Sequence, residues 1–217
     1  QWYPHRYLEM IATPKGDYYL PSQIHGQEVA LRLFKWIDST AIAQVTETIA
    51  FEAGKILADF HLAVQDVKGL NDLVEHAIEP LPHFHDTAWY LQHWQQALTK
   101  NQWADTSLDL REHLATIEHG VELINQFDIF RQQQLQQQPR IMHGDPKLAN
   151  MLFEHEQAIA LIDFDTIMTG LWLYDVADAL RSLCNTQPES GDVNQVGFNL
   201  DFFSAFMRGY APALLAW

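Results

Sequence analysis

One hairpin pattern near the middle of the chain constrains the fold more than any other sequence feature. The apolar segments Met151–Phe153 and Ala158–Ile162 are separated by a short polar stretch, which predicts two antiparallel strands joined by a turn. In the register that we expect, Asn150 faces Ile162 and stands beside Asp163, with paired Cα atoms about 5 Å apart. Polar side chains therefore meet at the open end of an apolar hairpin.

The oxygen atoms at this end of the hairpin suit a metal ion. An amide oxygen from Asn150 and a carboxylate from Asp163 can both bind Mg²⁺, which prefers oxygen ligands and keeps several waters. Asp163 also follows an apolar run that we expect to be buried, and an unpaired buried carboxylate is costly. The sequence therefore predicts that a cation or hydrogen-bond donors satisfy Asp163.

The loop that leads into the hairpin reads His-Gly-Asp-Pro-Lys-Leu-Ala-Asn over residues 143–150. Asp145 precedes Asn150 at the spacing D-x-x-x-x-N, where it can reach a substrate hydroxyl as a general base. Lys147 can place an ammonium group on a phosphoryl group. Protein kinases have the same spacing followed by D-F-G, which supplies a base and two metal ligands in that order. Each residue alone could also be a turn former, a strand cap or a strand-end polar group, but the two motifs together favour a phosphotransferase.

These motifs resemble those of the aminoglycoside phosphotransferase and choline kinase superfamily, with its H-G-D-x-x-x-x-N loop and its I-D-[FWL]-[DE] strand. The stretch from Ile162 to Gly170, with the helix that follows it, looks most like the N-acetylhexosamine 1-kinase branch. The resemblance covers about Tyr7 to Tyr210. It implies an α+β, protein-kinase-like fold, with truncated N-terminal lobe strands and a hinge in residues 1–37 and a mainly helical catalytic lobe in residues 38–217.

The expected site residues fall into five groups. They are Asp145 and Lys147 for catalysis; Asn150 and Asp163 for Mg²⁺; Phe34, Trp36 and Ile37 for a hinge along the adenine of ATP; Asp165 and Thr166 for the substrate; and His143 and Asp175 for structural support. For Phe34 and Trp36 the alternative is ordinary strand packing. Asp175 lies in the first turn of a predicted helix, where the helix dipole alone can account for it.

Some features of this chain differ from the pattern of the superfamily. Pro146 and Ala149 stand where sugar kinases often carry Thr and Asn, which leaves the identity of the sugar open. The resemblance also implies a glycine-rich phosphate loop and an ATP-binding lysine, both of which we expect upstream of Gln1.

Composition argues against several function classes. The chain has 217 residues and carries 13 Lys and Arg against 28 Asp and Glu, a formal charge of −15. This charge repels phosphate backbones and anionic lipid, so we expect neither a nucleic-acid nor a membrane partner. No apolar run approaches the roughly 18 to 20 residues that span a bilayer. Cys184 is the single cysteine and no signal peptide is evident, which favours a cytoplasmic location.

Apolar periodicity predicts the remaining elements. They are strands over 7–12, 18–20 and 29–37, a helix from residue 43, a loop over 79–86, helices over 87–101, 108–134, 172–183 and 200–210, and a solvated Gln-rich run over 132–138.

We therefore expect an ATP- and Mg²⁺-dependent kinase that acts on a hydroxyl of a small molecule, first of all the anomeric hydroxyl of an N-acetylhexosamine or a related sugar. The alternatives are an aminoglycoside, choline or homoserine kinase, and a non-catalytic fragment or partner-binding module. A zinc metallohydrolase that uses His83, His85 and Asp86 is a further alternative, because His-x-His can hold zinc.

Overall fold

The computed structural model describes residues 8–65, 67, 69, 70, 81–100, 117–127, 130, 140–187 and 191–215. Its helices and strands in chain order are β1 (Leu20–Ile24), β2 (Gln27–Leu31), α1 (Glu47–Gln65), α3 (Thr87–Lys100), β3 (Arg140–Met142), β4 (Met151–Glu154), β5 (Gln157–Leu161), β6 (Met168–Gly170), α5 (Trp172–Leu183) and α6 (Leu200–Leu214). Residues 117–127 are also helical. Within these ranges the strands form antiparallel pairs, β1 with β2, β3 with β6 and β4 with β5.

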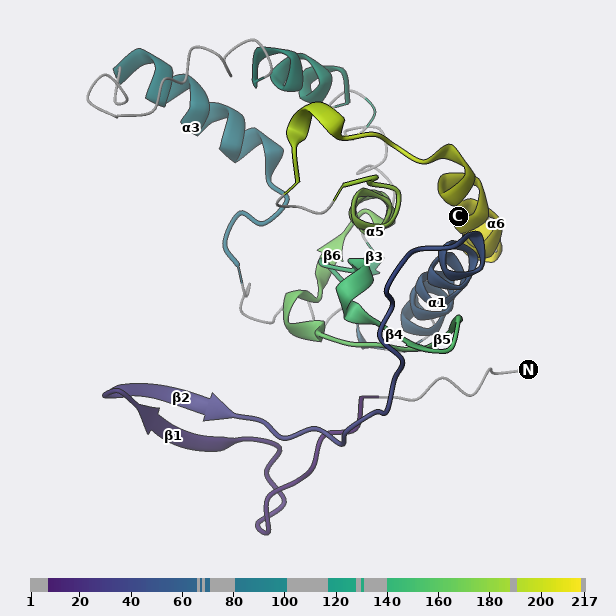
Figure 1. Ribbon diagram of the computed structural model, residues 1–217. Coiled ribbons are helices and arrows are strands. Elements are labelled where there is room, and N and C mark those ends of the chain that lie inside the picture. Colours follow the sequence, from purple (N-terminus) through teal and green to yellow (C-terminus); the bar gives the residue numbers. More distant parts are fainter. Residues whose placement is uncertain are drawn as a thin grey trace.

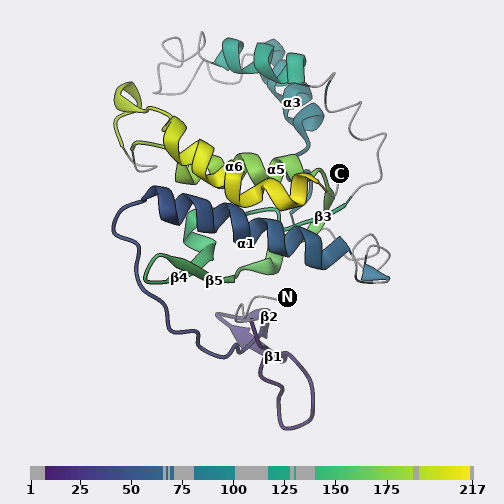
Figure 2. The ribbon, with the colours of Figure 1, turned by 90° about the vertical axis from the view of Figure 1, so that its right-hand side faces the viewer.

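Helices α1 and α6 lie side by side along one face of the molecule (Figures 1 and 2). Ala53 and Leu57 on α1 and Phe206 on α6 have fully buried side chains. Two glycines permit the close approach, because a Cβ atom at Gly54 or at Gly209 would overlap backbone of the other helix. This pair of helices packs with β5 and α5 around the main apolar core.

The β4–β5 hairpin confirms the strand pairing that the sequence predicts. Met151 pairs with Leu161, and the Ile162 N–H donates to the Asn150 carbonyl oxygen at 2.9 Å. A bulge places Ile159 between the residues that pair with Leu152 and Phe153. The register is therefore shifted by one residue near the turn, whereas the open end of the hairpin keeps the expected pairing. Asn150 therefore lies beside Asp163, as expected.

The β1–β2 hairpin extends away from the helical body (Figure 1). The prediction of one strand over residues 29–37 is wrong, because the chain leaves β1 after Leu31 and residues 33–35 hydrogen-bond to residues 9–11 instead. In residues 8–12, the described part of the strand predicted over 7–12, only Met10 forms a bridge, to Phe34. The strand predicted over 18–20 begins only at Leu20.

The helical predictions agree better with the structure. Helix α5 has the predicted bounds, and α3 ends within a residue of them. Helix α1 begins later than predicted, at Glu47, and α6 continues to Leu214. The helix predicted over 108–134 is helical in its described part, 117–127, whereas the Gln-rich run lies outside the described residues. None of the described helices combines the length and the hydropathy that crossing a bilayer requires.

Candidate active site

The carboxylate of Asp175 holds the backbone of the loop that contains Asp145. Oδ2 of Asp175 accepts the N–H of His143 at 2.7 Å, and Oδ1 accepts the N–H of Gly144 at 2.9 Å. The side chain of Asp175 is fully buried. The helix dipole alone therefore does not account for this residue, because its carboxylate directly holds two backbone amides of the loop.

Two further buried side chains complete this network. His61 Nε2 on α1 lies 2.8 Å from Asp175 Oδ2, and its Nδ1 lies 2.7 Å from the hydroxyl of Tyr210 on α6. A neutral imidazole satisfies both contacts when Nε2 donates to Asp175 and Nδ1 accepts from Tyr210. Burial lowers the pKa of His61, which agrees with the neutral form. The loop is thus tied to three helices.

His143 connects the loop to the end of β5. Its Nε2 donates to the Ile162 carbonyl oxygen at 2.9 Å, and its Nδ1 accepts the Asp145 N–H at 3.3 Å. These two roles require a neutral ring, because Nδ1 accepts a hydrogen bond. Burial lowers the pKa of His143, which agrees with the neutral form. The ring also packs against Phe164, with centroids 5.1 Å apart. The structural support expected of His143 has a direct basis in these contacts.

The Asp145 carboxylate is oriented by two neighbours. Its Oδ2 accepts from Lys147 Nζ at 2.7 Å and from Asn150 Nδ2 at 3.2 Å, and its backbone carbonyl accepts from the same amide at 2.8 Å. The hydrogen bond to Asp145 raises the pKa of Lys147, which keeps the ammonium charged. Asp145 Oδ1 has no hydrogen bond within the described residues and is available to an incoming hydroxyl.

Asp163 follows β5 in an unusual conformation. Its φ of 67° and ψ of 59° are left-handed, a conformation that is uncommon for non-glycine residues, although Asp adopts it more often than most. The apolar run before it is buried as expected, from Ala158 to Leu161. Asp163 itself is exposed, because the chain turns out of the hairpin directly after Ile162. Its carboxylate has no hydrogen bond or ion pair among the described residues.

The donor set at this point fits a divalent cation. The amide nitrogen of Asn150 is engaged by Asp145, which leaves the amide oxygen of Asn150 for a ligand. Together with the accessible carboxylate of Asp163 this gives oxygen donors of the type that Mg²⁺ prefers.

The two residues expected to bind substrate are both engaged within the protein. Thr166 Oγ1 donates to the carbonyl oxygen of His143 at 2.9 Å, and a Cβ atom at Gly144 would overlap the Thr166 carbonyl. Both carboxylate oxygens of Asp165 accept from Arg32 Nη2 at 2.7 Å. Thr166 thus supports the loop, and Asp165 connects the N-terminal segment to the body of the molecule.

The expected hinge residues lie between β2 and α1. Trp36 is 84% exposed and donates from its indole nitrogen to Asp38 at 2.9 Å, so ordinary strand packing does not explain it. Phe34 is half-buried and bridges to Met10. Ile37 is half-buried. Contact with adenine stays a prediction for all three residues.

The two histidines of the His-x-His motif have separate partners. His85 Nε2 lies 3.0 Å from the Gly144 carbonyl oxygen, whereas His83 lies 3.3 Å from Asp86 and stacks on Trp89. Over the described ranges, no group of three or more His, Cys, Asp or Glu side chains is placed to hold a metal. The two histidines that suggested a zinc hydrolase therefore make separate contacts. One of them, His85, contacts the loop at Gly144, directly before Asp145.

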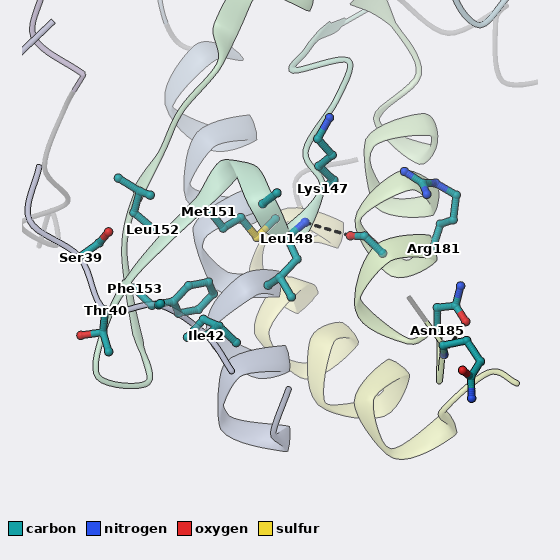
Figure 3. A pocket seen from close by; sticks show the side chains of 14 residues that line it. Ser39, Thr40, Ile42, Lys147, Leu148, Met151, Leu152, Phe153, Arg181 and Asn185 are labelled. Atoms are coloured by element: carbon teal, nitrogen blue, oxygen red, sulfur yellow. Dashed lines mark hydrogen bonds between the residues drawn. The ribbon is translucent and has the colours of Figure 1, made fainter. Parts of the chain in front are cut away.

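A cavity of about 570 Å³ opens beside this loop (Figure 3). Its walls come from residues 39–42, from residues 147–149 and 151–153, and from the end of α5 with the residues that follow it. Lys147, which bonds to Asp145, is part of the lining.

The family of the chain follows from comparison with known proteins. A model of the phosphotransferase enzyme family matches residues 8–212. The chain belongs to this family. Solved structures share its protein-kinase-like α+β fold. An aminoglycoside phosphotransferase from Alicyclobacillus acidocaldarius is 15% identical, with a TM-score of 0.57 over 95% of this chain and 59% of that one. A spectinomycin phosphotransferase in complex with ADP and spectinomycin is 14% identical, with a TM-score of 0.52 over 94% of this chain and 58% of that one.

This member of the phosphotransferase enzyme family thus spans about 60% of the length of the structures that it matches. Sequence reasoning missed His61 and Tyr210, which support the loop through Asp175. The only sequence signal of these two residues is a polar side chain on an otherwise apolar helix face, as at His61 on α1. Sequence reasoning considered His85 only as a zinc ligand, whereas His85 Nε2 lies 3.0 Å from the Gly144 carbonyl oxygen.

Proposed function

We propose that this chain is the catalytic portion of an ATP- and Mg²⁺-dependent kinase that phosphorylates a hydroxyl group of a small molecule. The observation that carries the proposal is the Asp145 carboxylate, which is held on one oxygen by Lys147 and Asn150 while the other stays available. A base in this geometry can accept the proton of an acceptor hydroxyl as the hydroxyl attacks a phosphoryl group.

The remaining loop residues have complementary tasks in this proposal. Lys147 would place a positive charge beside the phosphoryl group and would orient the Asp145 carboxylate through their hydrogen bond. Asn150 and Asp163 would hold Mg²⁺, which when bound neutralises charge on the phosphate oxygens. The buried Asp175 keeps the backbone of the loop in place, so that little reorganisation is needed during transfer.

For the acceptor, we propose the anomeric hydroxyl of an N-acetylhexosamine or a related hexose. The support is the resemblance of residues 162–170 to the N-acetylhexosamine 1-kinase branch. The family match and the shared fold support an aminoglycoside acceptor equally well, so the experiment must separate the two.

Phosphoryl transfer should be assayed on the longest protein product that contains this chain, by ADP release with N-acetylglucosamine, N-acetylgalactosamine, glucose, choline, homoserine and kanamycin. We expect turnover of a sugar, with the phosphate on the anomeric oxygen by NMR. Asp145→Asn should lose at least about 10²-fold in turnover, the lower range for general-base catalysis. Asp201→Asn removes an exposed carboxylate of α6 and should retain turnover.

The outcomes separate the parts of the proposal. Turnover of kanamycin or choline without any sugar would overturn the acceptor and leave the kinase. Near-normal turnover by Asp145→Asn would overturn the role of the base. No ADP release with any acceptor, from a folded protein that binds ATP, would favour the non-catalytic alternative.

A further inference from the structure

The cavity beside the loop has a lining whose charge is opposite to that of the whole protein. The chain carries 28 acidic and 13 basic residues, yet the described lining holds two cations, Lys147 and Arg181, and no Asp or Glu. Since acidic residues outnumber basic ones about two to one in the chain, an average surface would hold more carboxylates than cations. The lining therefore does not resemble a site for a polycation.

Each cation is paired with a carboxylate that is not part of the described lining. Lys147 donates to Asp145 at 2.7 Å, and Arg181 Nε donates to Asp178 Oδ1 at 2.9 Å. Neither carboxylate belongs to the described lining, and both side chains are partly buried. An ammonium group that entered the cavity would meet the cations first.

The rest of the lining suits a neutral ligand with both polar and apolar surface. Ser39, Thr40 and Asn185 offer hydroxyl and amide groups, and Ile42, Leu148 and Phe153 offer apolar contacts. Figure 3 shows these side chains around one hollow, with Lys147 at one end and Asn185 at the other. Pockets that combine apolar walls with a few polar groups are typical of small-molecule sites.

We propose that this cavity is the acceptor pocket and that it selects a neutral, hydroxyl-rich molecule of hexose size over a polycation. The proposal rests on the proposed function, because it takes Asp145 as the base that the acceptor must reach. Lys147 provides the connection, since it lines the cavity and also bonds to Asp145. Arg181 is the residue that sets the charge preference, by repelling ammonium groups.

Binding measurements on the longest protein product that contains this chain test the location of the site apart from catalysis. Ala149 is exposed and lines the cavity, so Ala149→Trp should fill part of it without disturbing the core. We expect N-acetylglucosamine binding, measured by ligand-observed NMR, to weaken at least about tenfold in this variant. Ala177→Trp adds the same ring at an exposed position of α5 outside the described lining and should bind as the parent chain does.

A charge reversal tests selectivity. Arg181→Glu should raise the affinity for kanamycin about tenfold or more, because an attractive charge replaces a repulsive one. Arg208→Glu, on the exposed face of α6, makes the same change in net charge and controls for general attraction of cations to an acidic protein. We expect it to leave kanamycin binding close to that of the parent chain.

The results also distinguish this proposal from the function on which it rests. Equal weakening in Ala149→Trp and Ala177→Trp, or no sugar binding at all, would overturn the cavity as the acceptor site. Tight kanamycin binding by the parent chain, abolished by Ala149→Trp, would overturn the charge preference. If Ala149→Trp removes sugar binding but the parent protein never releases ADP, the pocket would be upheld and the kinase activity overturned.

Discussion

His61 Nε2 on α1 lies 2.8 Å from Asp175 Oδ2 on α5, and both side chains are fully buried. Through this contact two helices far apart in sequence hold the backbone of the loop that carries Asp145. The pair has no sequence motif of its own, but the stability of the protein should depend on it.

The first prediction is acid destabilisation. Burial lowers the pKa of His61 and of His143 below the ordinary value of 6.5. The unfolded chain binds protons at these histidines below about pH 6.5 and the folded chain does not, so stability that is present above this pH is lost as the pH falls. Urea unfolding at pH 7.5, 6.5 and 5.5 should show the decline.

The variant His61→Gln tests which residue is responsible. The free energy of unfolding should then decline less between pH 7.5 and 5.5, by at most about 1.4 kcal/mol. This is the contribution of one histidine that titrates only when unfolded. His119→Gln, at an exposed histidine, should leave the decline as it is. An unchanged decline in both variants would show that His61 is protonated in the folded protein.

The second prediction concerns the carboxylate that holds the loop. The Asp175 carboxylate accepts three hydrogen bonds. In Asp175→Asn the amide NH₂ group would face at least one of these three donors and could not accept from it. We expect a loss of about 3 kcal/mol in the free energy of unfolding, as for buried hydrogen bonds to a charged group. Asp201→Asn, at an exposed site, should change it by less than about 0.5 kcal/mol. Similar values for the two variants in urea unfolding would contradict the anchoring role.

The third prediction concerns the packing of α1 on α6. Gly209→Ala adds a methyl group where Phe51 backbone already lies, so it should destabilise the protein by about 1 to 3 kcal/mol through overpacking. Gly120→Ala is the matched change in a helical segment with nothing near the added atom. It should be neutral or stabilising by up to about 1 kcal/mol. Thermal unfolding of both variants measures the difference, and equal melting temperatures would refute the close approach.

The fourth prediction concerns Mg²⁺. Asp163→Ala removes a ligand charge, so nucleotide binding in the presence of Mg²⁺ should weaken while metal-free binding changes little. Asp165→Ala removes the same charge nearby, at a residue paired with Arg32, and should leave the effect of Mg²⁺ intact. Calorimetric titration of ATP with and without Mg²⁺ measures both. Equal losses with and without the metal in Asp163→Ala would assign Asp163 to folding.

Much of the local structure could be predicted from the sequence. The apolar period of residues 172–183 predicts α5. Two apolar segments on either side of the polar residues 155–157 predict the β4–β5 hairpin, which brings Asn150 beside Asp163. These features depend on neighbours along the chain, so a pattern of a few residues contains them. The motif from His143 to Asn150 could be recognised in the same way.

The tertiary structure decided the environment of each of these residues. Asp163 is exposed although an apolar run precedes it, and Asp165 bonds to Arg32, a residue far away in the sequence. His61, Asp175 and Tyr210 meet because α1, α5 and α6 pack together, with glycines at the α1–α6 crossing. The burial of a charge and the partner of a hydrogen bond depend on which segments pack against each other in three dimensions, and periodicity along the chain contains no information about that choice.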